Sequence, residues 1–295
     1  MYIDIVFSGG GVKGFAFAGA LRVLENAGYQ FKRTAGTSAG SIVAALVAAG
    51  YSAEELKQIM GSMDTDKLIE PTAHIRFPII KWIRIYFKMG LFPGNHLEKW
   101  MNTLLREKGI ETFADLPKDR LKIIVSDVTK GRLLVIPDDL KDYGLDSLHF
   151  SVARAVRMSC SLPFFFEPVP LYDADGVKSL IVDGGILSNF PLWIFNRDEA
   201  LPVRPFVGLQ IVDKESENLE KKKIRNAVEL FRGLFNAMRE AHDERAIDKF
   251  KESNIIGLPV DKVTTKDFQI SAKERERLFQ IGAGSAEQFL KKWSY

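Results

Sequence analysis

Short apolar runs with strand-forming residues alternate with longer helix-forming runs through the first fifty residues. The first apolar run stops at a glycine cluster, Gly9–Gly11, and the first helix-forming run stops before Gly28, which suits a helix C-cap. The candidate strands cover residues 2–7 and 31–35, and the candidate helices cover residues 15–26 and 41–49. This alternation predicts an α/β fold with three layers, α/β/α, around a mostly parallel central sheet.

The rest of the chain continues the mixed pattern. Two apolar runs, 121–128 and 133–136, flank Thr129-Lys-Gly-Arg132 and predict a β-hairpin. Further candidate strands cover residues 179–182 and 206–212, and further candidate helices cover residues 148–158, 219–251 and 271 to about 293. Because the sequence contains no repeat, low-complexity tract or Pro/Ser-rich linker, we expect residues 1–295 to form a single domain.

Composition narrows the function classes. Lys and Arg number 41 against 38 Asp and Glu, and this excess is too small to indicate nucleic-acid binding. The single cysteine, Cys160, excludes an internal disulfide framework and fits a reducing compartment. The N-terminus has no basic segment of the secretory type, and the longest uncharged apolar run, 42–49, is far short of the roughly 20 residues that span a bilayer. We therefore expect a cytoplasmic protein that at most contacts a membrane surface.

Residues 36–40, Gly-Thr-Ser-Ala-Gly, form a G-x-S-x-G motif between a candidate strand and a candidate helix. A serine on such a tight turn has an exposed Oγ, and the flanking Gly36 and Gly40 allow the strained backbone. The start of the following helix adds partial positive charge where the oxyanion of acyl transfer would form. The motif therefore indicates Ser38 as a nucleophile; the alternative is a glycine-rich turn without chemistry.

A second glycine-rich segment matches G-x-G-x-x-G after a strand and before a helix. Dinucleotide binding would require an acidic residue about 20 positions later, but residues 30–36 contain no carboxylate. A P-loop is excluded because Phe15 follows the last glycine, where that motif requires lysine. The remaining functional interpretation is a nest of backbone N–H groups that binds an oxyanion, and the alternative is a turn needed only for packing. The candidate anion-binding residues are Gly9, Gly10, Gly11, Val12, Lys13 and Gly14.

A serine nucleophile requires a proton acceptor. The four histidines are His74, His96, His149 and His242. Only His242 lies well downstream of the motif, and it lies in a charged helical segment. Asp183 is the better candidate, because the apolar strand 179–182 ends there, beside Gly184 and Gly185. Partial desolvation would raise the carboxyl pKa above about 4, and contact with Ser38 would make proton transfer intramolecular. The competing interpretation is an Asp-Gly turn that closes a hairpin.

Taken together, these segments resemble the patatin-like phospholipase family. The matching segments are GGGVKG at 9–14, GTSAG at 36–40, DGGILSNFP at 183–191, and residues 158–163, which are similar to the family's A-S-x-x-x-P segment with Met158 in place of alanine. Their order and spacing agree with the family over about residues 1–215. Residues 216–295 are then a C-terminal helical extension of the same domain.

The resemblance implies a Ser38–Asp183 dyad in place of a triad, an acyl-enzyme intermediate, and oxyanion donors from residues 9–14. It implies hydrolysis of carboxylic esters in phospholipids and other acyl lipids, of the phospholipase A or lysophospholipase type, without metal or cofactor. Asn189 and Pro191 would shape the turn after the dyad aspartate.

Residues 77–92 combine aliphatic and aromatic side chains with cations at helical spacing, namely Lys81, Arg84 and Lys88. Such a segment suits a bilayer interface, with its aromatic residues inserted and its cations near phosphates. We predict a lid or membrane-contacting flap over Ser38 within residues 70–95; a helix packed on the core or on a second subunit is the alternative. The aromatic run 164–166 is either an acyl-pocket lining or a core cluster.

Three rival functions remain open at this point. An esterase or thioesterase acting on soluble acyl substrates would use the same residues. A membrane-surface scaffold without turnover would have no reason to retain Ser38, Asp183 and the glycine-rich segment together. A nicotinamide-dependent oxidoreductase is disfavoured by the missing acidic residue.

Overall fold

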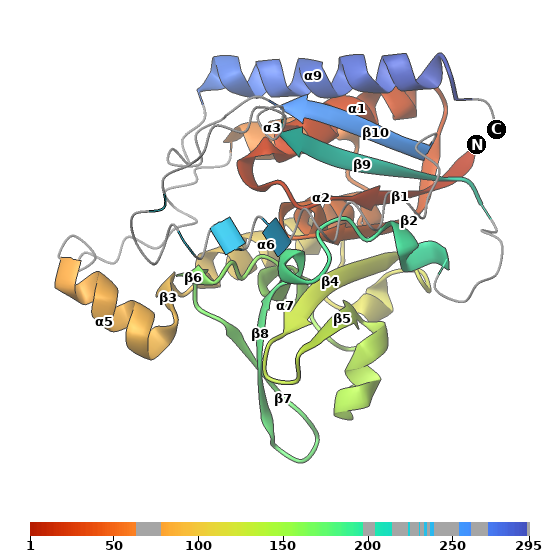
Figure 1. Ribbon diagram of the computed structural model, residues 1–295. Coiled ribbons are helices and arrows are strands. Elements are labelled where there is room, and N and C mark those ends of the chain that lie inside the picture. Colours follow the sequence, from red (N-terminus) through yellow and green to blue (C-terminus); the bar gives the residue numbers. More distant parts are fainter. Residues whose placement is uncertain are drawn as a thin grey trace.

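Figure 1 shows the chain in a computed structural model. The structure describes residues 1–62, 78–196, 204–213, 224, 230, 233–234, 237–238, 254–260 and 271–293. Four predicted features fall wholly or mostly outside these residues: the helix at 219–251, His74, His242, and the first part of the flap, 70–77.

The central sheet has eight strands in the order β10-β9-β1-β2-β4-β8-β7, with β5 paired to β4 off this path. The strands from β10 to β4 are mutually parallel, whereas β5 and β8 run antiparallel to β4, and β7 runs antiparallel to β8. The bounds are β1 Tyr2–Phe7, β2 Gln30–Thr37, β4 Leu121–Asp127, β5 Arg132–Ile136, β7 Val169–Tyr172, β8 Lys178–Asp183, β9 Phe206–Asp213 and β10 Ile255–Val260. This arrangement confirms the predicted α/β class with a mostly parallel sheet flanked by helices.

The inner strands are buried on both faces. Along β1, Ile3 and Ile5 belong to a large core shared with the helices, whereas Val6 belongs to a smaller cluster that includes Phe190 and Leu192. Opposite faces are expected for residues whose positions differ by one along a strand. The burial of β1 on both faces thus reflects its place between two layers.

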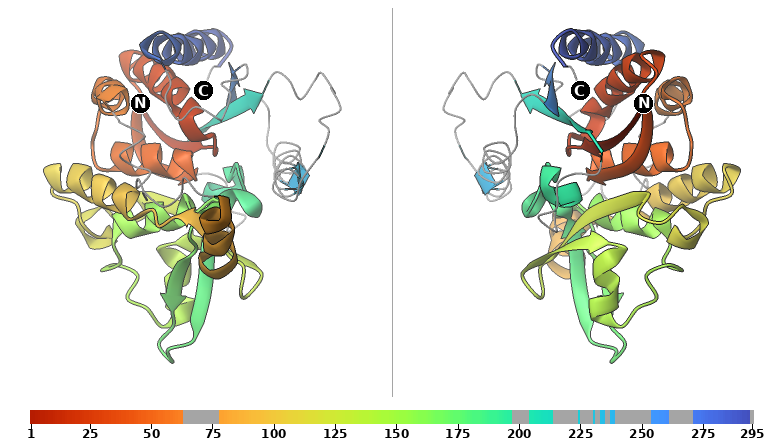
Figure 2. Two further views of the ribbon diagram at one scale, coloured as in Figure 1. Left: turned by 90° about the vertical axis from the view of Figure 1, so that its left-hand side faces the viewer. Right: turned by 90° about the vertical axis from the view of Figure 1, so that its right-hand side faces the viewer.

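The helices that flank the sheet are α1 Phe15–Asn26, α2 Ala39–Ala48, α3 Ala53–Ser62, α6 Asn95–Glu107, α7 Val152–Ser159 and α9 Ala272–Leu290 (Figure 2).

The C-terminal helix α9 lies directly against α1, although about 250 residues separate them in sequence (Figure 1). Two glycines permit this approach: a Cβ at Gly19 would lie 1.9 Å from the carbonyl oxygen of Phe279, and a Cβ at Gly282 would lie 1.9 Å from that of Ala16. The described part of the C-terminal region is thus built into the same core as the N-terminal motifs.

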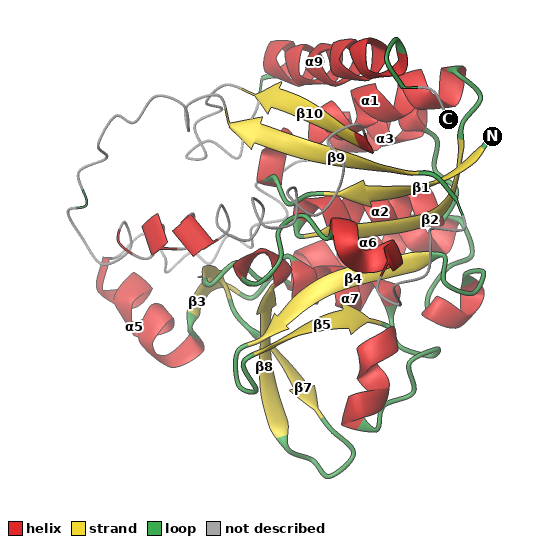
Figure 3. Cartoon of the chain, turned by 45° about the vertical axis from the view of Figure 1, so that its right-hand side comes forward, coloured by secondary structure: helices red, strands yellow, loops and turns green. Residues whose placement is uncertain are grey.

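The flap region contains helix α5 (Pro78–Lys88) followed by β3 (Gly90–Phe92), which pairs with β6 (Phe164–Phe166) in a separate two-stranded sheet. Helix α5 projects from the margin of the molecule (Figure 3). Trp82, Tyr86 and Phe87 on this helix are 61%, 80% and 71% exposed. Among the described residues, no helix has both the length and the apolar character needed to cross a membrane.

Several predicted boundaries are wrong by a few residues. The strand predicted at 31–35 runs to Thr37, and the helix predicted at 148–158 begins only at Val152. The side chain of Asp146 accepts hydrogen bonds from the backbone N–H groups of Leu148 and His149, which holds this stretch in a turn before the Ser151 N-cap. The predicted Phe164–Phe166 run is a partly exposed strand rather than a buried cluster.

Candidate active site

Ser38 and Asp183 come together because strands β2 and β8 pair with the same edge of β4 from opposite directions and end next to each other. Parallel β2 occupies this edge as far as Thr37, which is paired with Ile124. Antiparallel β8 approaches from the other direction and ends with Asp183 opposite Val125, the next residue of β4. The opposite edge of β4 is covered by β5. As a result, Ser38 Oγ donates a hydrogen bond to Asp183 Oδ2 over 2.6 Å.

Ser38 lies on the turn from β2 into α2, with φ 53° and ψ −128°. A positive φ is strained for a residue with a side chain, and such strain is typical of functional turns. A Cβ at Gly36 would lie 2.3 Å from the carbonyl oxygen of Gly40, and a Cβ at Gly40 would lie 2.4 Å from that of Ser8. Only glycine fits at the two positions that enclose the turn.

Asp183 is 2% exposed, and each of its carboxylate oxygens has a partner. Oδ2 accepts the Ser38 hydroxyl, while Oδ1 accepts the backbone N–H of Gly185 over 2.7 Å. A Cβ at Gly184 would lie 2.3 Å from the carbonyl oxygen of Ile124, so this position also requires glycine. The chain enters a short 3-10 turn, Gly184–Ile186, and the alternative of an Asp-Gly hairpin turn is therefore wrong.

The segment after Asp183 is tied to both glycine-rich motifs. Thr37 Oγ1 donates to the carbonyl oxygen of Ser188 over 3.0 Å, and the N–H of Gly9 donates to that of Asn189 over 3.0 Å. Pro191 is buried and its carbonyl oxygen accepts the N–H of Ile194. Asn189 and Pro191 thus lie in the turn where the resemblance places them.

The glycine-rich segment lies beside the serine, since a Cβ at Gly9 would be 3.5 Å from Ser38 Cβ. The backbone N–H groups of Gly9 and Lys13 already have acceptors: Gly9 donates to Asn189, and Lys13 donates to the carbonyl oxygen of Gly10 over 3.2 Å. That residues 9–14 supply the oxyanion donors stays a prediction. Gly10 and Gly11 lead into a short 3-10 turn, Gly11–Gly14, from which α1 continues.

Two residues of the segment 158–163, Ser159 and Ser161, contact both candidate catalytic residues. Ser159 Oγ accepts the N–H of Ser38 over 2.9 Å, and the carbonyl oxygen of Ser161 accepts the N–H of Asp183 over 2.9 Å. The resemblance to the family's A-S-x-x-x-P segment was the only signal in the sequence that pointed to these contacts.

The two described histidines belong to other parts of the fold. His96 is in the first turn of α6, and His149 lies on an exposed turn, where its Nδ1 contacts Asp146 over 2.7 Å. His149 therefore lies before the start of α7, although the predicted helix 148–158 included it. The described contacts of the Ser38 hydroxyl lead to a carboxylate, not to an imidazole.

Cys160 is buried, and its Sγ lies 3.9 Å from Ser41 Oγ. Burial, and then the negative charge of Asp183, raises the pKa of this thiol to about 12, so it stays protonated and unreactive at neutral pH. Within the described ranges, no group of three or more His, Cys, Asp or Glu side chains could hold a metal ion.

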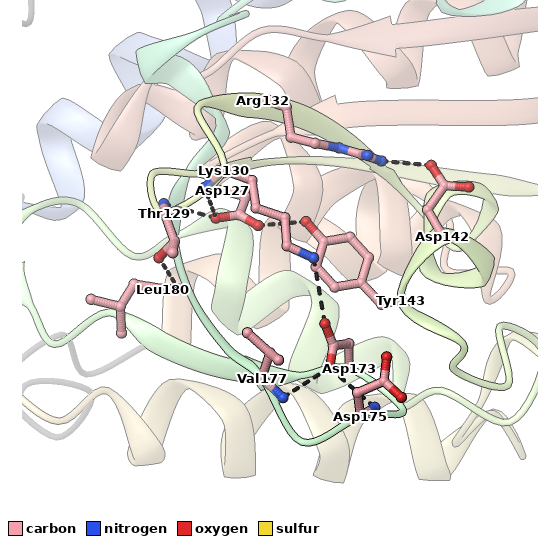
Figure 4. Close-up of polar contacts among 10 residues, drawn as sticks. All are labelled: Asp127, Thr129, Lys130, Arg132, Asp142, Tyr143, Asp173, Asp175, Val177 and Leu180. Atoms are coloured by element: carbon pink, nitrogen blue, oxygen red, sulfur yellow. Dashed lines mark hydrogen bonds and ion pairs between the residues drawn. The ribbon is translucent and has the colours of Figure 1, made fainter.

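A second polar cluster lies at the C-terminal end of β4, around its last residue, Asp127 (Figure 4). The buried carboxylate of Asp127 accepts the Tyr143 hydroxyl and the backbone N–H groups of Thr129 and Lys130, the latter two over 2.8 and 3.0 Å. Burial disfavours the charged carboxylate, but these hydrogen bonds outweigh burial and lower the pKa of Asp127. Lys130 also reaches Asp173 across 3.6 Å. These contacts hold the β4–β5 turn against the β7–β8 turn.

Comparisons with known proteins place the chain in a family. Residues 5–196 match the family model described as patatin-like phospholipase. The chain is 48% identical to the uncharacterized protein YqhO of Bacillus subtilis, over all of both chains. It is 30% identical to the triacylglycerol lipase ptl3 of Schizosaccharomyces pombe over 193 residues, which are 64% of this chain and 38% of that protein.

Among solved structures, the fold is similar to VipD from Legionella pneumophila, with a TM-score of 0.59 and 18% identity. This match covers 98% of the present chain and 66% of the VipD chain, and it bears on the fold alone. Since the family model spans more than half of the sequence, the chain belongs to the patatin-like phospholipase family, a membership that supports a lipid-hydrolase function.

Proposed function

We propose that this chain cleaves carboxylic esters of acyl lipids, as a phospholipase A or lysophospholipase, through a Ser38–Asp183 dyad. The observation that carries the proposal is the 2.6 Å hydrogen bond from Ser38 Oγ to Asp183 Oδ2. A base within hydrogen-bond reach of the nucleophile is the geometry that general-base activation requires. The second oxygen of Asp183 is fixed by Gly185, which keeps the first directed at the serine.

The reaction proceeds in two half-reactions. Ser38 Oγ attacks the ester carbonyl carbon while its proton passes to Asp183; the alcohol then leaves with that proton, and the acyl group remains on Ser38. Water next gives a proton to Asp183 and attacks the acyl carbon. Ser38 regains the proton as the fatty acid leaves, so one ester and one water become one alcohol and one acid.

We assign oxyanion stabilisation to the backbone N–H groups of Gly10 and Gly11. The N–H groups of Gly9 and Lys13 already donate to acceptors within the protein, which favours Gly10 and Gly11. Gly10 and Gly11 directly follow Gly9, which lies beside Ser38. The N-terminal end of α2, which follows the serine directly, adds partial positive charge. Donors of this kind contribute about 10²–10³-fold each to the rate of acyl transfer in other hydrolases.

Helix α5 is proposed to bring the enzyme to a phospholipid bilayer. Trp82, Tyr86 and Phe87 are more than half exposed, which is unusual for large apolar side chains without a partner surface. Arg84, expected to face lipid phosphates, binds Glu167 Oε1 over 2.8 Å and the carbonyl oxygen of Leu91 over 3.0 Å. It therefore anchors the helix to the strand β3 and the segment after β6, and the aromatic side chains carry the proposed contact.

A fluorophosphonate probe tests the proposal, with p-nitrophenol release from a medium-chain ester as the second readout. Wild type should react with the probe and turn over. Ser38→Ala should do neither, and Asp183→Asn should react at least about a hundredfold more slowly, because a positioned base contributes about 10²–10⁴-fold. Ser62→Ala, at the exposed end of α3, is the matched control. Probe labelling of a folded Ser38→Ala variant would refute the proposed nucleophile.

An esterase or thioesterase acting on soluble acyl substrates is the second candidate, since the same dyad would serve it. The exposed aromatic side chains of α5 favour the lipid substrate. Comparison of hydrolysis of a monomeric ester with hydrolysis of vesicle phospholipid, at equal ester concentration, separates the two. A folded wild-type protein that is inert in both assays would support a membrane-surface scaffold.

A further inference from the structure

One segment, Ser159–Ser161, contacts the backbone of both dyad residues. The hydroxyl of Ser159 accepts the N–H of Ser38, and two residues later the carbonyl oxygen of Ser161 accepts the N–H of Asp183, each over 2.9 Å. Ser159 is the last residue of α7, so a packed helix holds the segment in place. The separation of nucleophile and base therefore depends on three consecutive residues from a third element.

The two hydrogen-bond partners of the Ser159 hydroxyl decide which of them receives its proton. A backbone N–H can only donate and a carbonyl can only accept, so the hydroxyl donates to Ile124 O over 2.6 Å while it accepts from Ser38. Ile124 is the β4 residue paired with Thr37. The hydroxyl thus links β4 to the strained peptide at Ser38, and because Ser159 is 0% exposed, it does so out of contact with bulk water.

We propose that Ser159 is a positioning residue for acyl transfer, acting through the backbone of Ser38. This inference rests on the proposed function of Ser38 as nucleophile. The hydrogen bond holds Ser38 at its positive φ and so keeps its Oγ directed at Asp183. It also occupies the N–H of Ser38, so that oxyanion binding falls to other backbone donors. Because Ser159 is fully buried, we expect it not to contact substrate.

The expected effect of Ser159→Ala is a fall in kcat of about tenfold to a hundredfold with KM unchanged, because misplacement of a reacting group by about 1 Å costs up to 10²-fold in rate. The second-order rate of labelling by the fluorophosphonate probe should fall by the same factor. Ser159→Thr retains a hydroxyl and should restore most of kcat.

Thr34→Ala is the matched control. Thr34 is equally buried, it lies where β2 pairs with the first residue of β4, and its Oγ1 donates to the carbonyl oxygen of Ala44 over 2.9 Å. We expect Thr34→Ala to lower stability and to keep wild-type kcat per folded molecule, with the folded fraction measured by circular dichroism. A merely structural role for Ser159 would give the same result in Ser159→Ala.

The outcomes separate the two proposals. Activity in Ser38→Ala would refute the proposed function, and the role of Ser159 with it. An inactive Ser38→Ala together with wild-type kcat in Ser159→Ala would overturn only the role of Ser159. If Ser159→Ala does not fold, Ser159→Cys replaces it, since a thiol is a weaker hydrogen-bonding group. A folded Cys variant with unchanged kcat would overturn the proposal, and one with reduced kcat and unchanged KM would support it.

Discussion

The backbone N–H of Gly9 donates to the carbonyl oxygen of Asn189 over 3.0 Å, and a Cβ at Gly9 would lie only 2.3 Å from Asn189 Oδ1. The same Cβ would lie 3.5 Å from Ser38 Cβ. Two segments that are 180 residues apart therefore meet where a side chain on the first would displace the second. This contact fixes the glycine-rich segment next to the nucleophile.

We predict that Gly9→Ala lowers kcat at least about a hundredfold, because the added methyl group must move either Asn189 or the segment that carries the proposed oxyanion donors. The measurements are the rate of p-nitrophenol release from the ester and the rate of labelling by the fluorophosphonate probe. Gly61→Ala is the matched control, since a Cβ there meets nothing within 4 Å. Unchanged turnover in Gly9→Ala would contradict this role of the contact.

A second prediction concerns the α1–α9 crossing. A Cβ at Gly282 would lie 1.9 Å from the carbonyl oxygen of Ala16, so Gly282→Ala forces the two helix backbones apart. We expect it to lower the free energy of unfolding by about 1–3 kcal/mol or more, the usual cost of overpacking a core. Urea unfolding followed by circular dichroism measures the change.

Gly284 on the same helix provides the control for this prediction. A Cβ there meets nothing within 4 Å, so Gly284→Ala should raise stability by about 0.5–1 kcal/mol through helix propensity alone. Equal effects of the two substitutions would show that the close crossing does not contribute to stability.

A third prediction concerns pH and Asp127. The hydrogen bonds from Tyr143 and the backbone lower the pKa of this buried carboxyl below its unfolded value of about 4. Its contribution to stability is therefore complete above about pH 4 and is lost as pH falls through the lower folded pKa. Asp127→Asn should lower the free energy of unfolding by about 1–3 kcal/mol at pH 7, because an amide cannot accept all three bonds.

The difference in stability between wild type and Asp127→Asn should shrink as pH falls below about 4, where the unfolded wild-type carboxyl becomes protonated. Denaturant unfolding at a series of pH values measures it. A difference that stays constant down to pH 2.5 or so, well below the unfolded pKa, would show that the charge of Asp127 does not matter.

A fourth prediction concerns helix α5. The double substitution of Trp82 and Phe87 by Ser should abolish sedimentation with phospholipid vesicles while leaving hydrolysis of a monomeric ester unchanged, since the two exposed side chains carry the proposed bilayer contact. Leu148→Ser is the control, because Leu148 is 57% exposed on a different part of the fold. Vesicle binding that survives in the double variant would rule out α5 as the docking surface.

Much of the local structure follows from the sequence. Tyr2–Phe7 and Phe15–Asn26 form the strand and helix that their patterns predict, and the hairpin of β4 and β5 flanks its Thr-Lys-Gly-Arg turn. Propensity, capping and hydrophobic period act over a few residues, so these elements need no distant contact to be recognised. The start of α7 was misplaced because a polar turn anchored by Asp146 competes with helix formation.

The candidate chemistry could be read from the motifs, but its assembly could not. The sequence by itself determined a serine on a strand-to-helix turn and a carboxylate at the end of an apolar strand, because glycine spacing and strand length are local properties. Only the tertiary structure decided that β8 runs antiparallel and meets β2 head-on along β4, which puts Asp183 against Ser38. It alone also brought Ser159 to the Ser38 N–H and engaged Gly9 with Asn189. Strand direction and register depend on long-range packing of both sheet faces, which no local pattern encodes.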